Sequence, residues 1–200
     1  MNPFIGAFKP KQFYMENLSI SSKQLLSSLL NRVLFLTLFA CILAYMVESN
    51  IVEQYGDYAF SESPIKTALN VGAWVLSTFV IYGMIASVLG KMFSVVEKPV
   101  TIVTNTFWGQ FYGILLGSFA GMLIVIISLN FVSSAATLAS LSFLLPPIVA
   151  FFSIKAAYGY YAIKVSMQTT VGETVFLLTL THILNAIILA CLLGLIEMVF

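Results

Sequence analysis

Residues 106–129 read TFWGQFYGILLGSFAGMLIVIISL, a stretch without a charged side chain in which Gly109, Gly113, Gly117 and Gly121 are spaced four residues apart. In water, a glycine inside a helix costs roughly 0.5–1 kcal/mol relative to alanine, so this spacing argues against a helix in a soluble protein. In a bilayer the backbone has no water to bond with, and a spanning segment becomes helical almost regardless of propensity. Membrane helices associate through close packing, which small residues permit. The stretch therefore predicts a transmembrane helix with a glycine zipper along one face.

The composition of the whole chain agrees with a lipid environment. Hydrophobic residues make up 60% of the 200 residues and charged residues only 8%, and the mean hydropathy is +1.01. A soluble domain carries about a quarter charged residues. The net charge of +1 does not indicate a nucleic-acid partner. The apolar stretches have the length of roughly 20 residues that a helix needs to cross a bilayer.

These stretches predict an all-α fold, a polytopic bundle of about five transmembrane helices. Residues 1–30 are expected to form a cytoplasmic segment, either with an interfacial amphipathic helix or as a solvated tail, and residues 31–200 the transmembrane domain. The expected spans are residues 32–47, 67–89, 106–129, 147–166 or 135–154, and 174–199.

The fourth span has two possible registers. In the first, residues 135–154 form the span, Lys155 lies at its cytoplasmic end, and Pro146 and Pro147 break the helix near its middle. In the second, the helix starts at Pro147, where a proline is favourable, and Lys155 lies deep in the membrane. The second register is favoured because the proline pair and the tyrosines near the inner interface both fit it. Residues 131–145 would then form an external or re-entrant segment.

The basic residues predict the orientation of the chain, because lysine and arginine are enriched on the cytoplasmic side of membrane proteins. A cytoplasmic N-terminus places eight of the nine basic residues inside and leaves only Lys66 outside. The loop of residues 48–63 carries four acidic side chains, which suits an external position. With five spans, the C-terminus then lies outside, and the predicted topology is N-in/C-out.

Small residues also repeat in the fifth predicted span. The candidate helix-packing or oligomer seam consists of small residues at four-residue spacing, namely Gly109, Gly113, Gly117, Gly121, Ala186, Ala190 and Gly194. One interpretation is that these positions are internal seams of a compact bundle. The other is that they form a homo-oligomer interface or a seam that slides during transport.

Four polar residues are expected at depth and form the candidate intramembrane site, namely Gln110, Lys155, His182 and Asn185. Ionisable groups inside a bilayer are expensive and mark a pathway or a partner. His182 can act in that way, or it can be a neutral core residue that bonds across helices. No second His, Cys or carboxylate stands at ligand spacing in the spans, so neither a metal nor another cofactor is expected. The sequence offers no nucleophile elbow or carboxylate pair within a span, so an enzyme is not expected.

The layout resembles the Yip family, small five-span membrane proteins named for their interaction with Ypt/Rab GTPases. The resemblance rests on the opening MNPFIGAFKPKQF at residues 1–13, the turn GKMFSVVEKP at residues 90–99, and YGYYAIKVSMQTTVGETVF at residues 158–176. It implies a multi-pass protein of membrane organisation or trafficking. The long N-terminal cytoplasmic domain of the eukaryotic trafficking members has no counterpart here, so small-GTPase binding is not expected. The expected partners are the lipid bilayer and either another membrane protein or a second copy of the chain.

Two functions are compatible with these features. The first is a non-enzymatic scaffold or interaction partner in a bacterial plasma membrane or a eukaryotic endomembrane, with helices packed through the glycine zipper. The alternative is a small transporter or channel, or a membrane subunit of a larger complex, that uses Lys155, His182 and Gln110 along a polar path.

Overall fold

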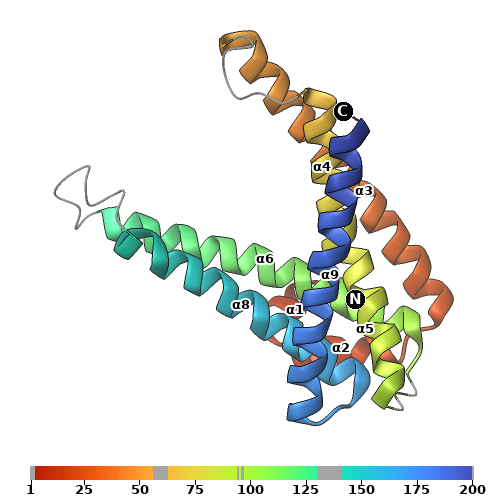
Figure 1. The fold of residues 1–200 in the computed structure, drawn as a ribbon. Coiled ribbons are helices and arrows are strands. Elements are labelled where there is room, and N and C mark those ends of the chain that lie inside the picture. The colour runs from red at the N-terminus through yellow and green to blue at the C-terminus, as the bar shows by residue number, and fades with distance from the viewer. Residues whose placement is uncertain (1–2, 56–62, 94, 96, 130–140, 200) are drawn as a thin grey trace.

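The computed structural model describes residues 3–55, 63–93, 95, 97–129 and 141–199, and these residues contain helices and no strand (Figure 1). Five helices are long and apolar enough to cross a membrane, which confirms the predicted fold class. They cover Ser22–Asn50, Pro64–Phe93, Pro99–Ser128, Leu145–Met167 and Val171–Val199. Residues 131–140 of the expected external or re-entrant segment and residues 56–62 of the acidic loop lie outside the described residues. Residues 141–145 and 48–55 are helical, so the expectation of a non-helical segment is wrong for them: the neighbouring span helices are longer than expected.

Two short helices precede the first span, α1 (Pro3–Phe8) and α2 (Pro10–Leu18). The third helix, α3 (Ser22–Tyr55), then runs without interruption through the first candidate span. The first span was expected to start near residue 32, and the helix begins ten residues earlier. The leucines that precede residue 32 recur at helical intervals, and no glycine or proline separates them from the span.

The second span consists of four consecutive helical segments. α4 (Pro64–Leu76) begins with a proline in its first turn, and the Ser63 hydroxyl accepts a hydrogen bond from the Lys66 amide at 3.2 Å. Such a cap satisfies one of the free N–H groups of the helix start. A π-helical turn, η2 (Ser77–Ile81), follows and leads into α5 (Tyr82–Gly90). One 3₁₀ turn, η3 (Lys91–Phe93), ends the segment.

The last three spans are α6 (Pro99–Leu129), α8 (Leu141–Met167) and α9 (Val171–Val199). α8 covers the whole of residues 147–166 and carries Lys155 in its interior. It begins before the proline pair, so Pro146 and Pro147 lie inside the helix and not at its start. Each proline lacks the N–H that would bond to the carbonyl four residues earlier, so the carbonyls of residues 142 and 143 lose their intrahelical donors.

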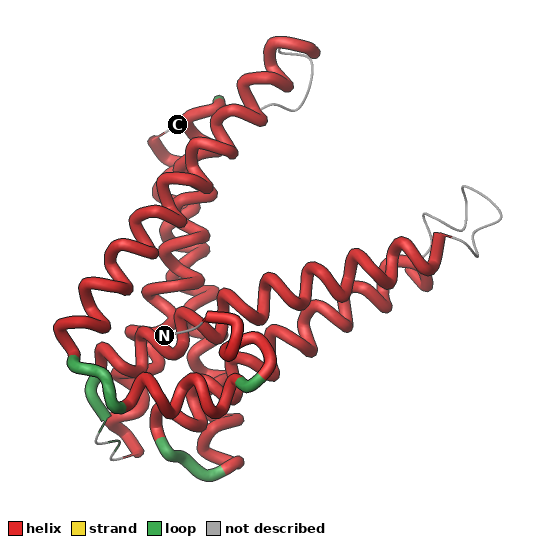
Figure 2. Tube along the Cα trace, turned by 180° about the vertical axis from the view of Figure 1, so that it is seen from behind, coloured by secondary structure: helices red, strands yellow, loops and turns green. Residues whose placement is uncertain are grey.

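The helices form two arms that diverge from a common base (Figures 1 and 2). α6 and α8 lie side by side along one arm, and their contact is the most extensive in the molecule. α3, α4 and α9 form the other arm. The short helices α1 and α2, together with α5, lie at the base where the two arms meet.

Aromatic side chains fill the base of the arms. Phe13 of α2 is 1% exposed and packs edge-on against Trp108 of α6, with the ring centroids 5.6 Å apart. The Arg32 guanidinium of α3 lies 4.6 Å from the centre of the Trp108 ring, a cation–π contact. This aromatic cluster joins α2, α3 and α6.

Candidate functional site

The four glycines of α6 are buried and face the backbone of α8. A Cβ atom added at each would lie 3.3 Å or less from an atom of α8. The nearest atoms belong to Ala162 for Gly109, Lys155 for Gly113, Phe151 for Gly117 and Pro147 for Gly121. For Gly113 and Gly117 the nearest atom is a backbone atom of α8, 2.9 Å away. Any side chain at these two positions would therefore push the helices apart.

The small residues of α9 have different surroundings. Ala186 and Ala190 are exposed, and a Cβ added at Gly194 would meet no atom within 4 Å. The structure thus separates the two halves of the candidate seam: the α6 half contacts α8, and the α9 half lies on an outer face of its arm.

Three of the four predicted polar residues lie at similar distances from the helix ends at the base of the molecule. Gln110 is eleven residues from the start of α6, His182 is eleven from the start of α9, and Lys155 is twelve from the end of α8. At 1.5 Å per residue, each lies about 16–18 Å from its helix end. These ends belong to the same side of the molecule, because a short linker joins α8 to α9 and Gln168 beside it donates a hydrogen bond to Glu97 before α6. The three residues therefore lie at similar distances along their helices from the base of the molecule.

His182 is held by two polar contacts. Its Nδ1 atom lies 2.8 Å from the Leu178 carbonyl and 3.2 Å from the Tyr82 hydroxyl of α5. A carbonyl can only accept a hydrogen bond, so the neutral ring makes this contact when Nδ1 carries the proton. The Nε2 atom is then an acceptor that the contacts to Leu178 and Tyr82 do not use.

A groove of about 370 Å³ lies beside His182, between α8 and α9. Its walls are Phe152, Lys155, Ala156, Leu178, Thr179, His182 and Ile183. Lys155 is the one charged side chain among the described residues that line it, and none of the described carboxylates pairs with its ammonium group. The groove therefore combines one cationic group and one imidazole with mainly apolar walls.

Gln110 lies deeper in the molecule, beside Gly159 of α8, and is not among the residues that line the groove. It is 1% exposed, and neither atom of its amide has a hydrogen-bond partner among the described residues. A Cβ added at Gly159 of α8 would lie 3.8 Å from the Gln110 Nε2 atom and 3.9 Å from the Tyr82 hydroxyl. The small residue at position 159 thus leaves Gln110 and Tyr82 close to each other, and Tyr82 contacts His182 in turn.

Asn185 lies one turn further along α9 and accepts a hydrogen bond from the Ser77 hydroxyl, 3.0 Å away. Ser77 is the first residue of the π-helical turn, a feature that is frequent at functional sites. The polar set therefore contains three residues that the sequence analysis did not select, Ser77, Tyr82 and Gly159. A π turn has no reliable sequence pattern, and a tyrosine or serine in an apolar stretch is common, so nothing in the sequence distinguished them.

No group of three His, Cys, Asp or Glu side chains that could hold a metal ion is found within the described parts of the chain. Comparison with protein-family models, with curated proteins and with solved structures found no match to this chain. The function must therefore be argued from the geometry of the polar set and its groove.

Proposed function

We propose that the chain is a non-enzymatic, multi-pass membrane carrier that holds a small anion in the groove between α8 and α9. The observation that carries the proposal is the meeting of Lys155 and His182 in one groove between two of the candidate spans. An ammonium group without a carboxylate partner is expensive in hydrocarbon, and such residues typically belong to substrate or ion pathways. A small anion is the ligand that would neutralise Lys155 and accept hydrogen bonds from it.

The buried amide of Gln110 supports a polar path and not an isolated site. Gln110, Tyr82 and His182 come from three helices and form a row of hydrogen-bonding groups that ends at the groove. A buried amide without a partner costs about 1–3 kcal/mol, so a polar ligand that reaches it would gain affinity. Five spans cannot be divided into two inverted repeats, and we therefore expect the carrier to work with a second copy of the chain.

Reconstituted liposomes test this proposal. Gradients of chloride, inorganic phosphate and a small carboxylate such as lactate are applied, and the charge movement is recorded for the wild type, Lys155→Met, His182→Ala and Lys98→Met. Lys98 is exposed and lies outside the groove, so its variant controls for the loss of a charge. We expect one anion to give a current that Lys155→Met abolishes and Lys98→Met retains. Equal currents in all four proteins, each folded, would contradict the proposal.

The second candidate function is a scaffold or interaction partner in membrane organisation, as the resemblance to the Yip family implies. The observation that favours it is the exposed row of Ala186 and Ala190 on α9, with open space at Gly194. Small residues let a helix of another protein approach closely. Since the α6 glycines face α8, the surface for another chain would be on α9.

Leucine substitutions separate this candidate from the first. Ala186→Leu/Ala190→Leu should remove a partner or a second copy from complexes extracted in mild detergent, whereas Cys191→Leu should not. Cys191 is also exposed on α9 and lies one residue away around the helix, so it is a matched control. If the wild type and both variants are each extracted without a partner, the small residues of α9 are not an interaction surface, and the result contradicts the scaffold function.

A further inference from the structure

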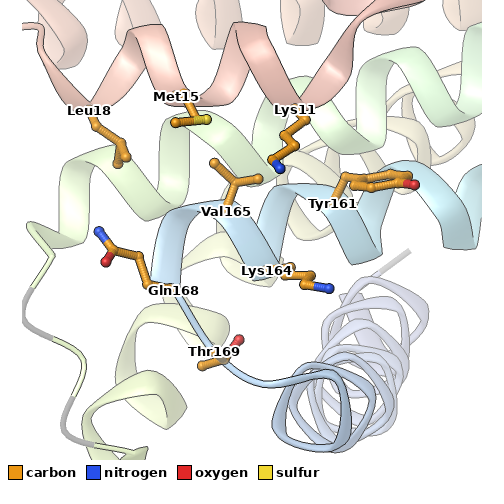
Figure 3. Close-up of a pocket in the computed structure, with 8 residues that line it drawn as sticks. All are labelled: Lys11, Met15, Leu18, Tyr161, Lys164, Val165, Gln168 and Thr169. Atoms are coloured by element: carbon orange, nitrogen blue, oxygen red, sulfur yellow. The ribbon is translucent and has the colours of Figure 1, made fainter.

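A second cavity lies at the base of the molecule, between α2 and the last turns of α8. It has a volume of about 450 Å³. Figure 3 shows Lys11, Met15 and Leu18 reaching from α2 toward α8, with Val165 reaching back from α8. Tyr161, Lys164, Gln168 and Thr169 complete the walls. None of these residues belongs to the groove of Lys155 and His182, and we call this cavity the base groove.

The wall formed by α2 is firmly attached to the transmembrane helices. Asn17 donates a hydrogen bond of 2.5 Å to the Asn105 side chain of α6, and Asn105 donates one of 2.8 Å to Ser166 of α8. Phe13 and Tyr14 are also buried at this contact. Burial raises the pKa of the Tyr14 phenol well above its usual value, so this side chain stays neutral. The base groove is therefore preformed and does not depend on a loop closing.

The base groove is positively charged. Lys11 and Lys164 supply two ammonium groups, and no carboxylate is among the described residues that line it. Lys164 donates one hydrogen bond to the Tyr160 hydroxyl at 3.1 Å, which leaves two of its three donors for a ligand. The nearby acids have other partners: Glu97 accepts from Gln168, and Glu173 accepts from Thr170 at the start of α9. Two lysines far apart in the sequence thus line one groove.

Most of the other walls are apolar, with Gln168 and Thr169 as the polar exceptions. Met15 is 54% exposed and Tyr161 is 41% exposed, and Leu18 and Val165 are half-buried beside them. The groove lies at the level where α8 ends, since Lys164 comes three residues before Met167. This is the level expected for the boundary between the hydrocarbon core and the headgroups. A ligand here can place a charged end on the lysines and an apolar end along Met15 and Val165.

We propose that the base groove is a binding site for an anionic phospholipid. The phosphate would accept hydrogen bonds from Lys11 and Lys164, and one acyl chain would lie along Met15, Leu18 and Val165. Both features of the ligand are needed. A free anion would leave the apolar wall uncovered, and a zwitterionic lipid such as phosphatidylcholine would bring a choline cation close to the two ammonium groups, which repel it. Because α2 and α8 both line the groove, the bound lipid would hold α2 against α8.

Native mass spectrometry of the purified protein tests the proposal. Wild type, Lys11→Gln/Lys164→Gln and Lys91→Gln/Lys98→Gln are each reconstituted with equal amounts of phosphatidylglycerol and phosphatidylcholine, and the lipid retained per protein is counted. The control pair removes the same charge from exposed positions at the same end of the molecule. We expect the wild type and the control variant to retain phosphatidylglycerol in preference to phosphatidylcholine. The groove variant should retain it about tenfold less, as expected from the loss of two lysine contacts.

Two further measurements identify the ligand and control for misfolding. Addition of inorganic phosphate should not displace the lipid, and displacement by millimolar phosphate would show a free-anion site and overturn the proposal. Met15→Glu introduces a carboxylate into the groove at an exposed position and should lower lipid retention as the double glutamine variant does. Lys11→Arg/Lys164→Arg should retain the lipid. Equal retention in the groove and control variants, or loss in both, would also overturn the proposal.

Discussion

Gly113 and Gly117 lie where α6 and α8 approach most closely. A Cβ at either position would meet the backbone of α8 at 2.9 Å, and backbone atoms cannot rotate away as a side chain can. Bulk at these positions would therefore have to separate two helices that share the largest contact in the molecule. The absence of a side chain at these positions is thus a packing requirement, which explains how the α6 helix accommodates its glycines.

Substitution of Gly117 by leucine should destabilise the protein. The new side chain would meet the Phe151 carbonyl and Cα, and overpacking of this kind costs roughly 1–3 kcal/mol or more. The measurement is the thermal unfolding midpoint in detergent, compared with that of Gly194→Leu. Gly194 has no atom within 4 Å of its Cβ position, so its variant introduces the same residue without a clash. A midpoint for Gly117→Leu equal to that of wild type would show that α6 and α8 do not pack as described.

The spacing of these glycines was readable in the sequence, but the helix that they face was not. A repeat of four residues defines one face of a helix, which is local information. The choice of α8 as the partner depends on which backbone can approach, and on Ala162 and Gly159 leaving room, which are contacts between distant parts of the chain. The same reasoning selected Gln110, Lys155 and His182 as deep polar residues, yet it could not place Tyr82 between two of them.

Among the helices, α2 is the element whose position the sequence did not indicate. Its nine residues offer three buried side chains, Phe13, Tyr14 and Asn17, of which two are polar. Such a helix has no strong apolar face, and the N-terminal segment was expected to be an interfacial helix or a solvated tail. Its attachment depends on Asn105, which donates to both the Tyr14 carbonyl and Ser166. The helices α2, α6 and α8, which carry these residues, come together only in the folded chain.

Phe13→Ala should release α2 from the base while the transmembrane helices stay folded. Phe13 is 1% exposed and contacts Trp108 and Tyr112, and removal of such a ring costs roughly 3–5 kcal/mol. Limited proteolysis in detergent measures the release, because an undocked segment is cleaved near residues 19–21 sooner than a docked one. Gln12→Ala changes an exposed neighbour and should leave the cleavage rate unchanged. Equal rates for both variants and wild type would mean that α2 does not depend on the aromatic cluster.

For the whole molecule, the sequence predicted five apolar helices well and their arrangement poorly. Hydropathy and length are properties of each segment, so the spans could be located. The first span begins ten residues and the third seven residues earlier than expected. The division into two arms depends on which helices pair, and these pairs join residues far apart in the chain. Each predicted span is apolar over most of its surface, so the sequence does not indicate which other helix it packs against.

The distribution of charge over the two ends of the molecule supports the N-in/C-out orientation as a testable prediction. Six lysines lie at the base or at helix ends that lead into it, namely Lys9, Lys11, Lys23, Lys91, Lys98 and Lys164. At the other end Lys66 pairs with Glu197, with 2.7 Å between nitrogen and oxygen, so its charge is balanced. Because excess basic residues stay in the cytoplasm, the base is expected to face the cytoplasm.

Cysteine labelling in intact cells decides this orientation. In a background without Cys41 and Cys191, Ser19→Cys reports the base and Met198→Cys the opposite end, and both positions are exposed. A membrane-impermeant maleimide should label Met198→Cys in intact cells and Ser19→Cys only after permeabilisation. The reverse pattern would place six lysines outside against the charge rule, and the base groove would then face the outer leaflet. Labelling of both positions in intact cells would be incompatible with five spans, since an odd number puts the two ends of the chain on opposite sides.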